Sequence, residues 1–140
     1  MAEAIARSRL AELGWDHVAV ASAGTSSFGA SPASDGALGA AGAHGLDLSA
    51  HASQPVTPDL LDGADLVLTM TPSHLLRVVE LGGGERAALL TSFASGIEGD
   101  VPDAVPDPFG GSAEVYEETF ELLEVLVDRT LLRLEPVLKP

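Results

Sequence analysis

The chain has 140 residues, 46% of them hydrophobic, which is enough to bury the core of one globular domain, expected over 1–140. Its 21 acidic residues against 7 basic ones give a formal net charge of −14, which disfavours nucleic acid and anionic membranes as partners. The lack of cysteine excludes a disulfide framework, a thiol nucleophile and a zinc–thiolate site within these residues.

The first third of the chain predicts a helix, a strand and a second helix. Residues 2–13 are predicted to be helical because apolar side chains recur at helical spacing and Gly14 ends the pattern. The apolar run 17–23 indicates a buried strand, and a loop rich in Ser, Gly and Pro follows at 24–32. Residues 33–44 are predicted to form the second helix, although its glycines lower the helix propensity.

The middle of the chain contains two marked helix starts. Thr57-Pro58 and Thr71-Pro72 each combine a capping hydroxyl with proline at the first helical position. Between them, residues 65–70 are the clearest predicted strand. Two further helices, one on each side of this strand, are therefore expected.

The last third predicts a short strand, a loop and a long helix. Residues 87–91 are a short apolar strand, 92–111 are expected to be a loop rich in Asp, Gly and Pro, and 112–135 are expected to be helical. Helices that alternate with apolar strands indicate an α/β fold with a parallel sheet, here a thin one of three strands. Such sheets bind ligands at the carboxyl ends of their strands.

Short motifs recur along the chain in a characteristic order. They are MAEA at 1–4, SAGT at 22–25 and DPFGG at 107–111, supported by GLDLSAH at 45–51 and ADLVLTM at 64–70. In this order and spacing they resemble the low-molecular-weight protein phosphatases, which act on phosphotyrosine and, in one bacterial branch, on phosphoarginine. The similarity extends over essentially all 140 residues.

The resemblance implies a three-layer α/β fold whose parallel sheet has four strands, with the family's first strand in the middle. A Cys-X5-Arg-Ser-Pro phosphate loop directly precedes the MAEA segment in that family. We expect this strand and loop, roughly 12–15 residues, to lie before Met1. The chain as given is therefore expected to lack the nucleophile and to be inactive. A start assigned at an internal methionine and a shortened paralogue would both account for this.

The expected gap in the sheet has an energetic consequence. Segments 17–23 and 65–70 would face each other across a slot with unpaired backbone groups, each costing about 1–3 kcal/mol. Several such groups rival the roughly 5–15 kcal/mol that stabilises a small domain. The 140 residues alone are thus expected to be molten, to aggregate, or to close the two strands together.

The resemblance assigns the general acid to Asp107, which would protonate the leaving group and then assist the attack of water. Pro108 would fix the local backbone, and the two glycines after Phe109 would let the loop bend. Read alone, Asp-Pro is a common turn opener before a helix cap. Asp103 is expected to be a solvated loop residue.

Other residues are assigned to the site by resemblance alone. Ser22 and His51 match positions that brace the family's phosphate loop, although each also reads as an ordinary loop residue. Phe28 and Phe109 match positions that contact the substrate, with core packing as the alternative for both. The remaining histidines lack ligand spacing, so neither a metal site nor a cofactor is expected.

Several functions follow from these observations. We expect hydrolysis of protein phosphomonoesters, with phosphotyrosine favoured, and phosphoarginine as the alternative towards which phenylalanine at position 109 leans. A non-catalytic module that offers a sheet edge to a partner strand, or a decayed paralogue, are further alternatives. The partner is expected to be a phosphorylated protein, not nucleic acid or membrane. Without a signal peptide or an apolar span, a cytoplasmic location is expected.

Overall fold

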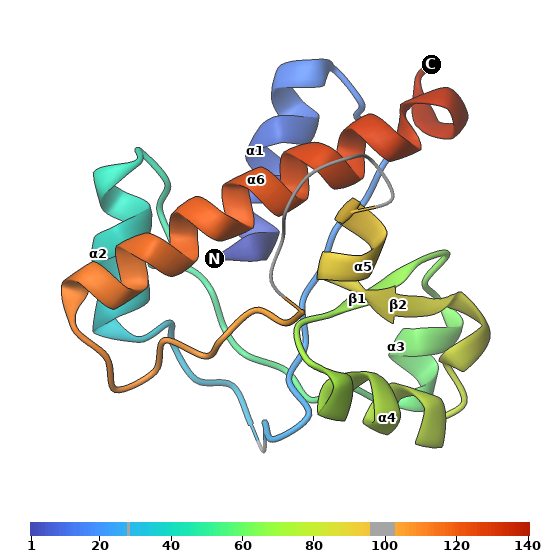
Figure 1. The fold of residues 1–140 in the computed structure, drawn as a ribbon, viewed down its shortest axis with the longest axis horizontal. Helices are drawn as coiled ribbons and strands as arrows, with labels where there is room; N and C mark the ends of the chain where they lie inside the picture. Colours follow the sequence, from blue (N-terminus) through green and yellow to red (C-terminus); the bar gives the residue numbers. More distant parts are fainter. Residues whose placement is uncertain (28, 96–102) are drawn as a thin grey trace.

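The computed structural model describes residues 1–27, 29–95 and 103–140 (Figure 1). No helix in the described part of the chain combines the length and the apolar character that crossing a membrane requires. The elements, in chain order, are α1 (Ala2–Leu13), α2 (Asp35–Ala43), α3 (Pro58–Asp62), β1 (Val67–Thr69), α4 (Pro72–Glu80), a 3-10 turn η1 (Gly84–Arg86), β2 (Ala87–Leu89), α5 (Leu90–Ser95) and α6 (Ala113–Leu138).

Local chemistry sets the helix ends. Ser34, Thr57, Thr71 and Ser112 each accept a hydrogen bond on the side-chain oxygen from the backbone N–H three residues later. α1 ends at Gly14, whose φ of 71° is a left-handed conformation that glycine adopts without strain. The predicted starts after Thr57 and Thr71 and at the Ser112 cap are therefore confirmed, whereas α2 begins two residues later than the predicted 33.

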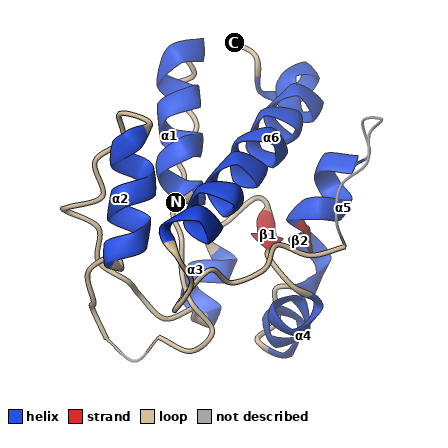
Figure 2. Ribbon diagram, turned by 60° about the vertical axis from the view of Figure 1, so that its left-hand side comes forward, coloured by secondary structure: helices blue, strands red, loops and turns tan. Residues whose placement is uncertain are grey.

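The sheet is short and parallel. β1 and β2 pair with Val67 opposite Ala87 and Thr69 opposite Leu89. Over the described residues the sheet contains these two strands, joined through α4. Figures 1 and 2 both place α5 and α6 on one side of this sheet and α3 and α4 on the other. The predicted parallel α/β fold is confirmed.

The prediction of a strand at 17–23 is wrong as far as pairing is concerned. In the part of the chain that the structure describes, this segment forms no ladder with β1. Side chains bind its carbonyls instead: Arg7 Nη2 donates to the Val20 oxygen at 3.1 Å, and Gln54 Nε2 donates to the Ser22 oxygen at 3.0 Å. The expected closure of this segment onto β1 is therefore not seen.

The expected strand at 87–91 and loop at 92–111 also need correction. The strand ends two residues earlier, and α5 occupies the start of the loop, of which residues 96–102 lie outside the described residues. Arg133 of α6 donates to the Phe93 carbonyl oxygen at 2.8 Å, and its guanidinium lies 4.3 Å from the centre of the Phe93 ring. Contacts with α6 thus stabilise a helix where local composition predicts a loop.

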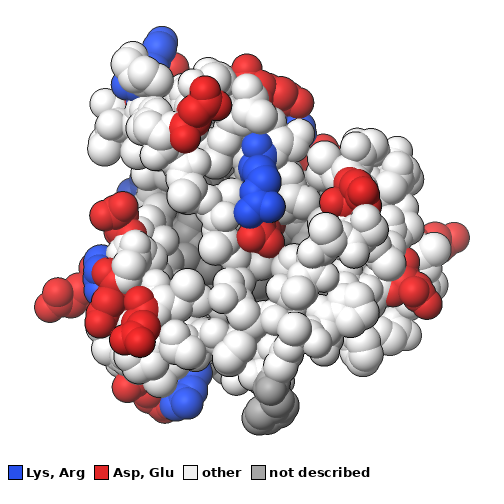
Figure 3. Space-filling model, turned by 180° about the vertical axis from the view of Figure 1, so that it is seen from behind, with Lys and Arg blue, Asp and Glu red and all other residues white. Residues whose placement is uncertain are grey.

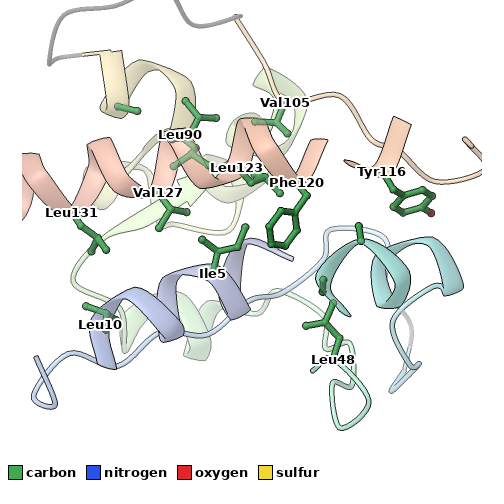
Figure 4. Close-up of a cluster of buried hydrophobic side chains, with 14 of the residues drawn as sticks. Ile5, Leu10, Leu48, Leu90, Val105, Tyr116, Phe120, Leu123, Val127 and Leu131 are labelled. Atoms are coloured by element: carbon green, nitrogen blue, oxygen red, sulfur yellow. The ribbon is translucent and has the colours of Figure 1, made fainter. Parts of the chain in front are cut away.

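The hydrophobic core lies between α6 and the helices α1, α2 and α5. Ile5 of α1 and Phe120 of α6 are 1% and 0% exposed, and Figure 4 shows them next to each other. Val105, in the chain that leads into α6, is 4% exposed and belongs to the same cluster. The core therefore fixes the base of the segment that carries Asp107.

Candidate functional site

A carboxylate in the first turn of α1 holds together two of the predicted site residues. Glu3 Oε2 accepts a hydrogen bond from Ser22 Oγ at 3.1 Å and lies 3.3 Å from His51 Nδ1. The other oxygen, Oε1, pairs with Arg7 Nη2 at 3.1 Å. The Glu3 side chain is only 17% exposed, so these partners surround a carboxylate that is largely shielded from water.

Ser22 and His51 meet because the segments that follow them are joined. The Gly24 N–H donates to the Gln54 oxygen at 2.9 Å, and the Val56 N–H donates to the Gly24 oxygen at 3.1 Å. These bonds form an isolated parallel bridge between the two segments. The bridge brings two distant parts of the sequence to the N-terminal end of α1.

Asp107 lies exposed in the segment between α5 and α6. Its Oδ1 accepts a hydrogen bond from the Phe109 N–H at 3.0 Å, which closes a local turn. Two residues earlier, the Val105 N–H donates to the Met70 oxygen at 2.9 Å, just beyond β1. The base of this segment is thus fixed at the carboxyl end of a strand, while the carboxylate reaches the surface.

The end of the DPFGG segment requires its two glycines. Gly110 has a φ of 80°, in the left-handed region that disfavours other residues. A Cβ on Gly111 would lie 2.8 Å from the Pro108 oxygen and 2.9 Å from Val115 Cγ1. The segment then enters α6 through the cap of Ser112. This geometry determines where Asp107 sits relative to α6.

The predicted site residues fall into two groups. Ser22 and His51 meet on Glu3, whereas Asp107 and Phe109 share one turn, and over the described residues no hydrogen bond or ion pair joins the two groups. In Figure 1 the N-terminal end of α1 points towards the orange segment that leads into α6.

Of the two phenylalanines predicted to contact the substrate, the structure describes only Phe109. The Phe109 side chain is 79% exposed, so it packs against no core and is open to a ligand. Phe28 lies outside the described residues. Asp103 is exposed, as expected, and its carbonyl oxygen accepts a hydrogen bond from Thr91 Oγ1 at 3.1 Å. Over the described ranges, no three His, Asp or Glu side chains gather in a way that could hold a metal ion.

Glu3 is the residue that sequence analysis misses. An acidic residue in the first turn of a helix is usually explained by the positive partial charge of the helix N-terminus. Because the helix N-terminus alone explains such a residue, the sequence gives no reason to look for side-chain partners. The partners that Glu3 has, Ser22 and His51, are far away in the sequence. The signal that could have found Glu3 is its position inside the MAEA motif, directly beside the expected phosphate loop.

Comparison with known proteins finds one protein family whose sequence model matches nearly the whole chain. The sequence model described as "Low molecular weight phosphotyrosine protein phosphatase" matches residues 1–137. A protein-arginine-phosphatase of Bacillus subtilis is 39% identical over 79 residues, which cover 55% of this chain and 50% of that protein. A low molecular weight protein-tyrosine-phosphatase of Streptomyces coelicolor is 35% identical over 133 residues, which cover 89% of this chain and 78% of that protein. The chain thus spans about half the length of the first of these relatives.

A solved structure extends the likeness to the fold. The YwlE arginine phosphatase, in a mutant whose active-site serine is phosphorylated, superposes with a TM-score of 0.88 at 32% identity. The superposition covers 97% of this chain and 87% of that structure. The likeness therefore extends over nearly the whole chain.

Proposed function

Because the chain belongs to the low molecular weight phosphotyrosine protein phosphatase family, we propose that its domain removes phosphoryl groups from phosphorylated proteins. Phosphotyrosine is the proposed substrate and phosphoarginine the alternative. The observation that carries the proposal is the family match over residues 1–137. We propose Asp107 as the general acid, as the resemblance of its DPFGG segment implies. We also propose that the protein is cytoplasmic, as the sequence predicts.

In this proposal Asp107 is the general acid that donates a proton to the leaving group. The leaving oxygen needs a proton as its bond to phosphorus breaks, and a carboxyl group at the surface of the site can supply it. Oδ1 of Asp107 is engaged by the Phe109 N–H. Over the described residues, Oδ2 has no hydrogen-bond partner and is left for the substrate.

The nucleophile does not come from these residues. The family mechanism uses a cysteine thiolate on the phosphate loop, and the 140 residues contain no cysteine. On their own they are therefore proposed to be inactive, and an active protein would need a Cys-X5-Arg segment adjoining α1. Ser22, His51 and Glu3 would then contact the end of that segment.

The choice of substrate depends on the exposed ring of Phe109. An aromatic face can stack on the ring of phosphotyrosine, and a planar guanidinium stacks on the same face. The first relative reported above is named as an arginine phosphatase, which favours phosphoarginine as the second candidate. A side-by-side assay of phosphotyrosine and phosphoarginine peptides decides between them.

A binding module is a further candidate, favoured by a single observation. The segment 17–23 forms no ladder with β1 over the described residues, and a segment outside any ladder is open to pairing with a partner strand. The test is the intact mass, N-terminal sequence and phosphatase activity of the protein purified from its own cells. A cysteine-containing, active protein supports the phosphatase, whereas an inactive protein contradicts it and favours the module or a decayed paralogue.

A further inference from the structure

The segment that leads to Asp107 is held at the carboxyl ends of both strands. After β1, the Met70 oxygen accepts a hydrogen bond from the Val105 N–H at 2.9 Å. After β2, Thr91 Oγ1 donates a hydrogen bond to the Asp103 oxygen at 3.1 Å. These anchors lie four and two residues before Asp107, at the edge of a parallel sheet where ligands bind.

The two anchors differ in the groups that form them. The bond between Val105 and Met70 joins two backbone groups, so it does not depend on either side chain. The bond to Asp103 depends on the hydroxyl of Thr91, whose residue is only 2% exposed. A hydroxyl removed from water needs a partner, and its partner here is the carbonyl at the start of the segment. Thr91 is therefore the buried side chain that holds this end of the segment.

Ion pairs do not hold the segment. Over the described residues, neither Asp103 nor Asp107 lies in an ion pair. Figure 3 shows one face of the molecule, on which Lys and Arg side chains lie next to Asp or Glu side chains. The ion pairs within the described ranges use other carboxylates, such as those of Glu3 and Asp128. Hydrogen bonds and core packing are thus left to position the segment.

The local sequence makes the segment stiff. Asp107 lies between Pro106 and Pro108. Proline fixes its own φ near −65° and restricts the backbone of the residue before it. A shift at Asp103 is therefore transmitted along the segment towards the carboxylate of Asp107, because few backbone torsions are free to absorb it.

We propose that Thr91 is a positioning residue for the proton donor Asp107. The inference rests on the proposed phosphatase function and adds to it the group that fixes the height of the acid above the sheet. Thr91 acts through the backbone of Asp103 and does not itself contact the substrate. A general acid must come within about 2.6–3.2 Å of the atom that it protonates, so a small displacement of the segment slows proton transfer.

The test compares two aryl phosphates whose leaving groups differ in basicity. Phenol, like the tyrosine side chain, has a pKa of about 10 and needs a proton as its bond to phosphorus breaks. 4-Nitrophenol is a much weaker base and leaves more readily as the anion. The quantity measured is kcat/KM, which reports the loss of transition-state stabilisation relative to the free enzyme and substrate. Wild type and variants are purified from the protein's own cells.

Thr91→Val removes the hydroxyl and keeps the shape of the side chain. It should lower kcat/KM for phenyl phosphate by about threefold or more, and for 4-nitrophenyl phosphate by less than about twofold. Thr91→Ser keeps the donor and should retain the wild-type ratio of the two values. Should the valine variant fail to fold, Thr91→Ala must show the same selective loss. An equal loss for both esters would mean that Thr91 is merely structural and would overturn the inference.

A double variant tests whether Thr91 acts through the acid. Asp107→Asn should show the same dependence on the leaving group, with a larger loss. Adding Thr91→Val to Asp107→Asn should cause no further selective loss, because a positioning residue acts only through the group that it positions. Additive selective losses would overturn the inference.

Thr119→Val is the matched control. Thr119 is also buried, at 7% exposed, and its Oγ1 donates to the Val115 oxygen at 3.0 Å within α6. This variant loses a comparable hydrogen bond but leaves the anchor at Asp103 intact, so the ratio of the two kcat/KM values should stay unchanged. The same selective loss in Thr119→Val would overturn the inference, because any lost buried hydroxyl would then produce it.

The remaining outcomes separate this inference from the function on which it rests. Wild-type kinetics in Thr91→Val, in a protein that hydrolyses both esters, would overturn the inference alone. Unchanged kinetics in Asp107→Asn would overturn the inference and the role of Asp107, and would leave the phosphatase function standing. Absence of hydrolysis of both esters by the wild type would overturn the proposed phosphotyrosine function together with the inference.

Discussion

The hydroxyl of Ser22 donates a 3.1 Å hydrogen bond to Oε2 of Glu3, and this carboxylate oxygen also lies 3.3 Å from His51 Nδ1. Two residues assigned by resemblance to bracing the phosphate loop therefore also brace the helix that follows it. A partly buried carboxylate with several donors stabilises its surroundings more than an exposed ion pair does. The first turn of α1 is thus tied to the ends of two distant segments.

Replacing Glu3 should destabilise the domain. Glu3→Ala leaves Ser22 and His51 without their shared acceptor, and the free energy of unfolding should fall by about 1–3 kcal/mol. Glu12→Ala is the control on the same helix, because its side chain is 65% exposed. The control should change stability by less than about 0.5 kcal/mol. Urea denaturation measures both, and equal losses would contradict the bracing role of Glu3.

Replacing Asp107 should reduce catalysis without reducing stability. If the protein purified from cells is active, as proposed, Asp107→Asn would remove the proposed proton donor, and kcat should fall by about 10²–10⁴-fold. Asparagine retains an oxygen for the Phe109 N–H, so the local turn should persist. Asp103→Asn, a matched change in the same segment, should leave kcat within about twofold. Similar kinetics for the two variants would remove Asp107 from the mechanism.

Stability should depend on pH through His44. Its Nε2 lies 2.6 Å from Glu117 Oε1, and its ring stacks on Phe120 at 4.2 Å. The hydrogen bond to Glu117 raises the pKa of His44 above its ordinary value, with nearby Glu121 and Glu124 acting in the same direction. Protonated His44 therefore stabilises the folded chain.

The sign of this effect sets the pH window. The folded-state pKa of His44 is raised, so its contribution is fully present below the unfolded value of 6.5. It is lost as pH rises from there through the raised pKa. The urea midpoint should fall over this range, and the fall should shrink in His44→Gln but not in His74→Gln. An unchanged profile in His44→Gln would exclude this residue as the source.

Local chemistry accounts for the parts of the fold that the sequence predicts correctly. The first helix has its predicted bounds because Gly14 ends it in a left-handed conformation. The helices after Thr57 and Thr71 begin as predicted because a hydroxyl cap and a following proline act within four residues. Parallel pairing of β1 with β2 follows from the crossover through α4.

The failures concern features that depend on distant residues. Whether 17–23 joins a sheet depends on the backbone beside it, and Arg7 and Gln54 bind its carbonyls instead. α5 forms because Arg133 engages Phe93 from α6. The role of Glu3 was missed for the same reason, because no local pattern shows which side chains will meet it.

The glycine at position 111 offers a test of how the acid is positioned. In Gly111→Ala the new Cβ would lie 2.8 Å from the Pro108 oxygen, so the DPFGG segment must move. A displaced Asp107 should lower kcat in the active protein by about tenfold or more, because misplacement by about 1 Å can cost up to 10²-fold. KM should change less, since the position of the proton donor matters mainly in the transition state.

Gly39 provides the matched control, since it lies inside α2 and a Cβ there would meet nothing within 4 Å. Gly39→Ala should raise the free energy of unfolding by about 0.5–1 kcal/mol and leave kcat unchanged, because alanine reduces the entropy of the unfolded chain. Thermal melts and steady-state kinetics on both variants separate the two effects. If Gly111→Ala kept full kcat, the backbone around Asp107 would not determine where the acid acts.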